Sequence, residues 1–313
     1  MKAVKISDKA LAHILMILLV FAWGFDYVPA KWGLAVMTPE CLMFFKFGIG
    51  ALFVIPLKLL SKNRELFRKK DIPIFIACAI FGQIGYFECE FNAMALMPVA
   101  LITIVLAFTP VVSILIERVL YKRKANGKIY IGILGCLVGI MLVVGADFSI
   151  LTQGRGIGYL LAVGAVLCWN IYNFITAGLK GYDSLTLSVN QLVCATLMLV
   201  PAAVHSMPPA SAFSPLLIFG LIWIGIVDSG FGYLIVIYGL KKLGPTTNAV
   251  YSNFLPVTSA FFGAIFLGET ISLLQIIGGI IVIAAGFVVI REKGKIDEKK
   301  GEDDEKKGTP DES

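Results

Sequence analysis

Long, almost uninterrupted runs of apolar residues are the dominant pattern of this chain. Each run is close to the ~20 residues that a helix needs to cross ~30 Å of hydrocarbon. Ten such runs lie at 11–37, 40–60, 72–95, 98–118, 129–146, 156–179, 184–204, 215–239, 246–267 and 273–290. In a bilayer only helices and closed barrels satisfy every backbone group, and runs this continuously apolar are typical of helices. The pattern therefore predicts an all-α integral membrane protein with ten transmembrane helices.

The charge content excludes the other broad classes of protein. The chain has 313 residues, of which 58% are hydrophobic and 15% are charged. The stretch 291–313 alone holds 16 charged side chains, which leaves 32 in the first 290 positions, or about 11%. Soluble domains carry roughly 25% because they must cover their surface in water. A soluble enzyme is therefore excluded, and the stretch 292–313 is expected to be a disordered charged tail.

The lysines and arginines predict the orientation of the spans. With a cytoplasmic N-terminus, the inside segments carry 24 of the 27 basic residues, and the outside loops carry only Arg155. Short cytoplasmic loops are normally the basic ones. Both termini are therefore expected in the cytoplasm, in a multi-pass protein of the plasma (inner) membrane. The net charge of +6 then reports membrane topology and predicts no nucleic-acid partner.

The cysteines and histidines indicate no metal or redox chemistry. All six cysteines lie in apolar runs without a Cys-x-x-Cys pair, which is typical of small buried hydrophobic residues. The two histidines, His13 and His205, are far apart in the sequence. The glycine-rich stretch 154–158 follows no strand, so we interpret it as a turn and not as a nucleotide site. No metal, no cofactor and no catalytic residue is predicted.

The two halves of the chain match at a constant offset. The pairs are Trp23 with Trp169, Pro110 with Pro256 and Gly132 with Gly278 at 146 residues, and Gly85-Tyr86 with Gly232-Tyr233 at 147. Each repeat would hold five spans, an odd number, so the second copy must be inverted in the membrane. The expected organisation is a cytoplasmic N-terminus at 1–10, repeats at 11–146 and 156–291, an outside linker at 147–155, and the tail. Inverted repeats of this 5+5 kind are typical of transporters that open alternately to each side.

The motifs of both repeats resemble a known family. Ala22-Trp23-Gly24 is similar to the start of an EamA-type repeat of the drug/metabolite transporter superfamily. Phe254-Leu255-Pro256, Leu267-Gly268-Glu269 and Gly286-Phe287-Val288 are similar to its later motifs. The resemblance covers roughly residues 11–291 and implies a ten-helix fold that moves small metabolites, amino acids or drugs, commonly outward. The first repeat departs from the pattern, because Arg123 stands at the position equivalent to Glu269, and Lys46 stands where the family often has arginine.

Polar residues inside the third span are candidates for a transport site. Glu88, Glu90 and Asn92 lie within five positions of one another, and a charge at mid-helix costs roughly 2.5–3.5 kcal/mol on insertion scales. Glu88 and Asn92 share one face, and Glu90 lies on another. At least one carboxylate should therefore face an aqueous cavity, where an ammonium-bearing substrate or a proton would suit it. The alternative is a buried ion pair between one of these carboxylates and Lys46, which could itself snorkel.

The first and sixth spans present the same polar and aromatic face. On the first span this face holds Trp23, Asp26 and Tyr27, and an offset of 146 places Trp169, Tyr172 and Asn173 on the sixth. We interpret the two faces as symmetric walls of a cavity. The ninth span adds candidates. The full set of expected substrate-binding residues is Trp23, Asp26, Tyr27, Lys46, Glu88, Glu90, Asn92, Trp169, Tyr172, Asn173, Asn248 and Tyr251.

Glycine stripes on the fifth and tenth spans predict close helix packing. They include Gly135 and Gly139 on one span and Gly278 on the other. The packing is either between these two spans or across a homodimer.

The sequence predicts a secondary active transporter, with export favoured by the resemblance. The expected partners are a small-molecule substrate, protons as a coupling ion and the lipid bilayer. The alternative is an intramembrane enzyme or a membrane receptor. An enzyme would need a reactive cluster of His, Asp or Ser near one membrane surface, and the sequence indicates none.

Overall fold

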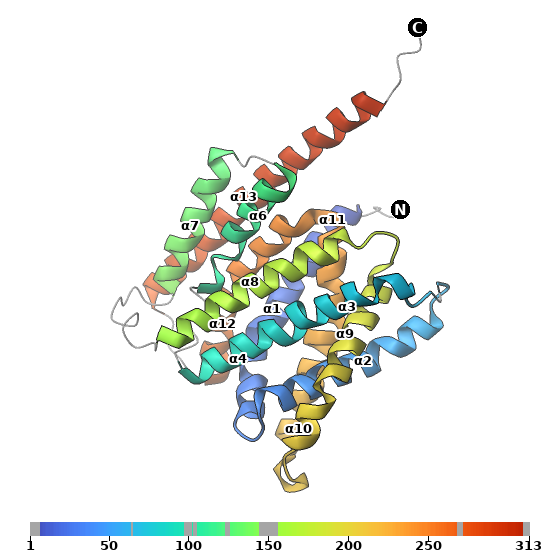
Figure 1. The fold of residues 1–313 in the computed structure, drawn as a ribbon. Coiled ribbons are helices and arrows are strands. Elements are labelled where there is room, and N and C mark those ends of the chain that lie inside the picture. Colours follow the sequence, from blue (N-terminus) through green and yellow to red (C-terminus); the bar gives the residue numbers. More distant parts are fainter. Residues whose placement is uncertain are drawn as a thin grey trace, which may run out of the picture.

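The structure is a computed structural model that describes residues 7–63, 65–96, 102, 105–122, 126–143, 156–267 and 272–308. Within these ranges the chain contains helices and no strands, arranged as one bundle (Figure 1). Seven helical stretches are long and apolar enough to cross a membrane, and Gly127–Leu142 is a shorter apolar helix. The prediction of an all-helical membrane fold is confirmed for the described residues.

The first half of the chain folds into helices that follow the predicted runs. They are α1 (Asp8–Leu34), α2 (Pro39–Leu60), η1 (Lys69–Asp71), α3 (Ile72–Cys78), η2 (Ala79–Gly85), α4 (Tyr86–Leu96), α6 (Thr109–Tyr121) and α7 (Gly127–Val143). Side chains cap the first two helices: the hydroxyl of Ser7 accepts from the Ala10 N–H, and that of Thr38 accepts from the Cys41 N–H. The third predicted span is one continuous rod made of α3, η2 and α4.

The second half repeats this arrangement. Its helices are α8 (Gly156–Gly178), α9 (Ser184–His205), η4 (Ala210–Ala212), α10 (Pro215–Ile222), η5 (Trp223–Phe231), α11 (Gly232–Val250), η6 (Tyr251–Phe254), α12 (Leu255–Leu267) and α13 (Leu273–Gly308). Within α11, Gly244 has a φ of 79°, and Pro245 follows it directly. This φ is accessible to glycine, so the chain turns here between the eighth and ninth predicted spans.

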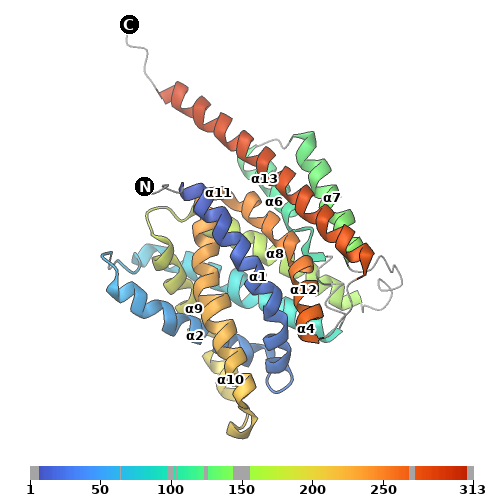
Figure 2. The same ribbon diagram turned by 180° about the vertical axis from the view of Figure 1, so that it is seen from behind.

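The contacts between the two repeats are related by a two-fold pattern. η2 packs against α8 and α9, whereas η5 packs against α1 and α2. A two-fold operation that exchanges the two repeats interconverts these two sets of contacts. The same operation leaves two large contacts unchanged, α2 with α9 and α7 with α13. The second of these is visible from both sides of the bundle, where α7 and α13 lie side by side (Figures 1 and 2).

The glycine stripes bring α7 and α13 into close contact. A Cβ atom on Gly139 would lie 2.8 Å from the Gly278 carbonyl oxygen, and one on Gly132 would lie 2.6 Å from the Val289 side chain. Of the two alternatives for these stripes, packing within one chain is therefore the one that the structure shows.

Pro110 and Pro256 each stand in the first turn of a helix that restarts in the middle of a predicted span, α6 after the turn at 107–108 and α12 after the 3₁₀ segment η6. A proline suits such an interruption because it has no N–H to donate. One expectation differs from the structure. The tail was expected to be disordered from residue 292, but α13 continues as helix to Gly308. Alternating Lys and Glu residues favour such an extension because they have high helix propensity and form pairs three or four positions apart. The linker 147–155, Arg123 and Glu269 lie outside the described residues.

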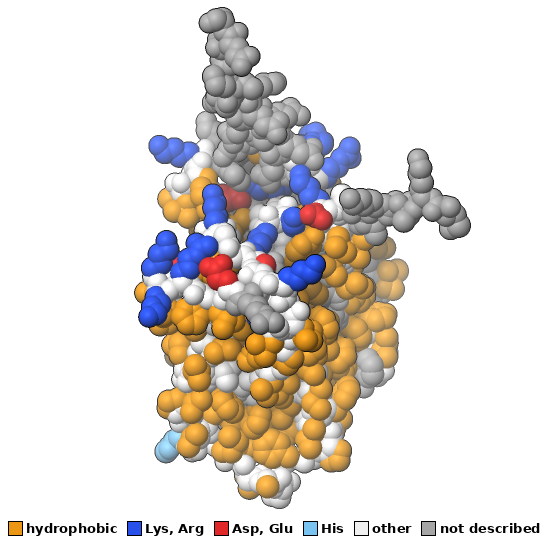
Figure 3. Space-filling view, turned by 90° about the vertical axis from the view of Figure 1, so that its right-hand side faces the viewer, with side chains coloured by type: hydrophobic (Ala, Val, Ile, Leu, Met, Phe, Trp, Pro, Cys, Tyr) orange, Lys and Arg blue, Asp and Glu red, His pale blue; other side chains and the backbone are white. Residues whose placement is uncertain are grey.

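Basic side chains gather at one end of the bundle, above a broad belt of hydrophobic side chains (Figure 3). We call this end, which carries Lys58, Arg68, Lys241 and Lys293, the basic end. The belt includes strongly exposed apolar residues such as Leu52, Leu160 and Leu197, which are 72%, 72% and 65% exposed. Apolar exposure on this scale suits a surface that is covered by lipid.

Candidate functional site

A cavity lies near the middle of the bundle and is lined by both repeats. The lining side chains come from spans one, three, four, six, eight and nine, and they are Trp23, Asp26, Tyr27, Ala30, Tyr86, Phe87, Glu90, Phe91, Leu106, Thr109, Trp169, Asp228, Tyr233, Ser252 and Leu255. The volume of this cavity is about 60 Å³. This volume holds a few water molecules and is well below the ~300 Å³ of a typical small-molecule pocket. The cavity must therefore widen to admit a metabolite.

Aromatic rings form the walls of this cavity. The rings of Trp23 and Trp169 meet edge to face with their centroids 6.0 Å apart. Trp169 also contacts Tyr86 at 5.1 Å and Tyr233 at 6.4 Å. The two tryptophans predicted as symmetric walls thus come from opposite repeats and touch each other. Rings arranged in this way offer electron-rich faces to a cationic group.

Glu90 is the carboxylate of the third span that lines the cavity. Its Oε1 accepts a hydrogen bond from the Tyr86 hydroxyl at 3.1 Å and one from the Tyr27 hydroxyl at 3.3 Å. The residue is buried, with only 5% of its surface exposed. Two neutral donors satisfy one of its oxygens without neutralising its charge.

Lys46 lies beside the cavity without lining it and pairs with two aspartates that do line it. Its ammonium group forms an ion pair with Asp228 and lies 3.4 Å from Oδ2 of Asp26. The same ammonium stands 4.4 Å from the centre of the Phe87 ring. Lys46 is completely buried, so it does not snorkel to a membrane surface. The Lys46–Glu pair proposed as an alternative is replaced by this aspartate–lysine–aspartate cluster.

Glu88 and Asn92 do not line the cavity. The Asn92 amide donates to Oε1 of Glu88 at 2.9 Å and to its backbone oxygen at 2.8 Å. Both side chains are partly exposed on another face of α4. The i,i+4 spacing that made them candidates instead lets the two residues satisfy each other.

The remaining candidates are buried around the cavity and not in its lining. The hydroxyl of Tyr172 donates to Oε1 of Gln191 at 3.1 Å, behind the Trp169 ring. Tyr251 is joined to Nδ1 of His13 at 2.5 Å. Asn173 and Asn248 are likewise buried, 0% and 3% exposed. These four residues support the walls and the basic-end half of the bundle.

Sequence reasoning missed two lining tyrosines, Tyr86 and Tyr233. Each follows a glycine, in one of the two Gly-Tyr pairs that mark the repeat offset. Their recurrence in a repeat was the available signal, since a polar aromatic residue conserved between the two halves of one chain suggests a shared role. Asp228 also lines the cavity, and it forms an ion pair with Lys46.

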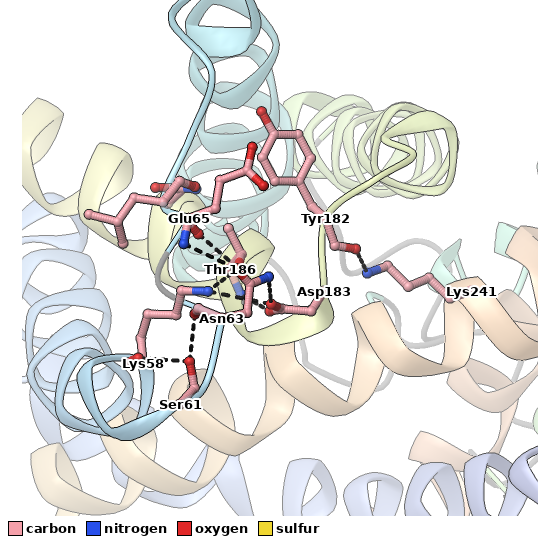
Figure 4. Close-up of polar contacts among 10 residues, drawn as sticks. Lys58, Ser61, Asn63, Glu65, Tyr182, Asp183, Thr186 and Lys241 are labelled. Atoms are coloured by element: carbon pink, nitrogen blue, oxygen red, sulfur yellow. Dashed lines mark hydrogen bonds and ion pairs between the residues drawn. The ribbon is translucent and has the colours of Figure 1, made fainter.

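A second polar cluster joins the two repeats at the basic end (Figure 4). Lys58 of α2 contacts both Asp183 Oδ2, at 3.4 Å, and the Thr186 hydroxyl. Asn63 donates to the same Asp183 oxygen at 2.7 Å, and Lys241 donates to the Tyr182 carbonyl. These contacts tie the connection after α2 to the start of α9 at this end of the molecule.

An interlocked pair of helical repeats, surrounded by an apolar belt and enclosing a polar and aromatic cavity at mid-depth, defines a membrane transport protein. The chain belongs to the EamA-like transporter family, whose pattern matches residues 10–145 and again residues 156–291. It is a multi-pass integral protein of the plasma membrane. The resemblance to the EamA-type repeat of the drug/metabolite transporter superfamily is thus confirmed in both halves.

Several relatives are similar to this chain over most of their length. An uncharacterized transporter, YoaV, of Bacillus subtilis (strain 168) is 21% identical over 88% of this chain and 94% of its own. A probable amino-acid metabolite efflux pump of Salmonella typhimurium is 21% identical, covering 86% of this chain and 91% of its own. A solved crystal structure superposes with a TM-score of 0.74 at 18% identity, covering 89% of this chain and 96% of that one, which shows a shared fold.

Proposed function

We propose that this protein is a secondary active transporter that exports small metabolites by alternating access. The proposal includes ten spans, both termini in the cytoplasm, and two repeats of opposite orientation around the central cavity. The observation that carries it is the cavity itself, because Trp23 and Trp169, equivalent residues of the two repeats, meet in its wall. A site on a pseudo-two-fold axis is the arrangement that lets one solute be reached from either side.

The charges of the cavity favour a substrate with an amino group. Asp26, Asp228 and Glu90 contribute three carboxylates, and Lys46 supplies one ammonium group against them. A buried excess of negative charge is costly unless a cation or a proton enters. Amino acids and amphipathic amines carry such a group next to an apolar part that the aromatic walls would accept. The name of the Salmonella relative is consistent with this class of substrate.

Protons are the proposed coupling ion, and Glu90 is the proposed carrier. It is the cavity carboxylate whose described hydrogen-bond partners are both neutral hydroxyls. A proton and an ammonium group would compete for it, so that entry of one releases the other. Such competition yields exchange of substrate for protons without any nucleotide.

Transport by purified protein in liposomes tests the proposal. The vesicles would be loaded with an equimolar mixture of amino acids and small amines, a pH gradient would be imposed, and each solute would be measured on both sides by mass spectrometry. We expect at least one solute to move unaltered. A new chemical species instead of a displaced solute would favour an intramembrane enzyme, and no movement of any solute would contradict transport of this class.

The two cavity tryptophans give a sharper test. Trp23→Ala and Trp169→Ala should each weaken transport about tenfold or more, because each removes one half of a shared wall. Phe287→Ala is the matched control, since this ring is 55% exposed on the lipid-facing side of α13. Equal activity of both tryptophan variants and the control would show that the cavity is not the substrate site.

A further inference from the structure

The two π-helical segments occupy equivalent places in the two repeats. η2 spans Ala79–Gly85 and η5 spans Trp223–Phe231, and each leads into a Gly-Tyr pair that matches the other at an offset of 147 residues. A π-helical turn within a longer helix is uncommon and is frequent at functional sites. Its occurrence at the same place in both halves indicates a role that both repeats share.

The tyrosines that follow these segments are held in different ways. The hydroxyl of Tyr233 crosses to the other repeat and donates to the backbone carbonyl of Gly82, inside η2, at 2.6 Å. The hydroxyl of Tyr86 makes no such crossing in this structure and donates instead to Glu90 at 3.1 Å. The repeats are therefore symmetric in sequence here and asymmetric in their contacts.

The repeat offset identifies the partner that Tyr86 would have in the exchanged state. Gly82 stands three positions before Gly85, and the residue three positions before Gly232 is Ser229. Ser229 is buried within η5, and its carbonyl already accepts from the Gly232 N–H. A carbonyl oxygen has two lone pairs, so it can accept a tyrosine hydroxyl as well.

The Tyr233 contact lies on the basic-end side of the cavity. Eight residues separate Tyr233 from Lys241, which is about 12 Å along a helix. The Lys58–Asp183 cluster also joins the two repeats at the basic end. The Tyr233–Gly82 bond and this cluster therefore hold the two repeats together in the same half of the molecule.

We propose that Tyr86 and Tyr233 are reciprocal gate residues of the transport cycle. In this structure Tyr233 binds the Gly82 carbonyl and closes the basic-end side of the cavity. In the opposite state Tyr233 releases that carbonyl, and Tyr86 leaves Glu90 to bind the carbonyl of Ser229, which closes the other side. The inference rests on the proposed function. It adds two positioning residues, Tyr86 and Tyr233, and the hydrogen bond between Tyr86 and Glu90 through which a bound ligand would act on them.

Glu90 provides the link between ligand and gate. An ionised carboxylate holds a hydroxyl donor more strongly than a neutral acceptor does. A proton or an ammonium group bound at Glu90 weakens its hold on Tyr86, so the tyrosine becomes free to bind Ser229. Occupation of the cavity thus favours the state in which the basic end opens.

Hydrogen–deuterium exchange in detergent or nanodiscs, without any solute, tests the gate. Residues 65–68 and 179–183 report on the basic end, and residues 35–38 and 206–214 report on the opposite end. Tyr233→Phe should raise exchange at the basic end and lower it at the opposite end. Tyr86→Phe should do the reverse when it is made in a Glu90→Ala background, where the bond from Tyr86 to Glu90 is already absent and only the bond to Ser229 can be lost. Loss of one hydrogen bond predicts a change of about fivefold in each case.

Tyr238→Phe is the matched control, because the Tyr238 hydroxyl also donates to a carbonyl at the basic end, that of Asp8, but outside the cavity. It should change exchange only near residue 8. The gate proposal is overturned if a Tyr86 or Tyr233 variant changes exchange in the same direction at both ends of the molecule, as general destabilisation would. It is also overturned if neither variant changes exchange at the end of the molecule that lies farther from the substituted tyrosine. Transport assays on the same preparations distinguish failure of the gate from failure of the proposed function. If the wild type transports no solute but the variants change hydrogen–deuterium exchange in opposite directions at the two ends, only the proposed function is contradicted.

Discussion

Lys46 shows how a single buried charge organises the cavity. Two aspartates from opposite repeats, Asp26 of α1 and Asp228 of η5, meet at its ammonium group. Both aspartates form their ion pairs with this one lysine, which is fully buried. Lys46 therefore acts as a link between the repeats beneath the aromatic walls.

Removal of Lys46 should be costly. Lys46→Met leaves two buried carboxylates without a counter-charge, which typically costs about 3–5 kcal/mol of stability. The triple variant Lys46→Met with Asp26→Asn and Asp228→Asn should recover most of this loss. Thermal unfolding in detergent measures both. Lys242→Met, which breaks an exposed pair with Asp8, should leave the midpoint unchanged. Equal midpoints for Lys46→Met and wild type would show that the cluster contributes little.

The two glutamates of α4 allow a matched comparison of coupling. Glu90→Gln removes the cavity carboxylate, so pH-driven transport should fall at least tenfold while solute exchange continues. Glu88→Gln makes the same change two positions away, at a side chain that bonds Asn92 outside the cavity. It should leave the proton dependence intact. Proteoliposome assays at several external pH values give the answer, and unchanged proton dependence of Glu90→Gln would exclude this residue as the carrier.

The sequence could not choose between these glutamates for a geometric reason. Two residues that are two positions apart point to opposite sides of a helix, and both sides of this span are apolar. Only the position of α8 shows which side borders the cavity. The ion-pair partners of Lys46 could not be predicted from the sequence either, because Asp228 lies 182 positions away and only the fold brings it near. By contrast, Trp23 and Trp169 were identified by the repeat, since symmetry places equivalent residues at the axis.

At the scale of the elements, the spans were predictable and their internal irregularities were not. Length and hydropathy place the helices, but an α-helical and a π-helical turn have nearly the same apolar pattern, so η2 and η5 left no trace in the sequence. The prolines were visible but ambiguous, because proline suits both a kink and a first turn. In the structure both descriptions hold, because each of Pro110 and Pro256 stands in the first turn of a helix that restarts in the middle of a predicted span.

The contact between α7 and α13 should be sensitive to one methyl group. In Gly139→Ala the new Cβ would lie 2.8 Å from the Gly278 oxygen and 2.9 Å from the Val282 nitrogen, both backbone atoms. The helices must then separate, at a cost of about 1–3 kcal/mol. Gly127→Ala in the same helix meets nothing within 4 Å and is the control. Thermal unfolding should distinguish them, and equal midpoints would contradict the close packing.

At the scale of the whole molecule, the basic-end cluster should hold throughout the physiological pH range. Partial burial opposes ionisation of Asp183, but the Thr186 N–H and hydroxyl and the Lys58 ammonium outweigh it and hold the pKa of this carboxyl below its usual 3.8. A lowered pKa stabilises the folded state above the unfolded value, and this contribution is lost only as the pH falls through the folded value.

Exchange at residues 65–68, corrected for its intrinsic rate, should therefore stay constant from pH 8 to pH 5 in the wild type. Asp183→Asn removes the charge that Lys58 meets and should raise exchange there at every pH. An increase in the wild type over this range would show that another group controls the closure.

The charge count of the cavity has an electrical consequence. When its three carboxylates are ionised, the empty site carries two net negative charges, and a bound cation lowers this to one. A membrane potential acts on each charge that moves through it, at about 2.3 kcal/mol per elementary charge per 100 mV. A negative cell interior therefore pushes the empty carrier toward its outward-facing state more strongly than the loaded one. After a substrate is released outside, the voltage of the cell would therefore oppose the inward return of an empty carrier, and a proton bound in the cavity would reduce this opposition.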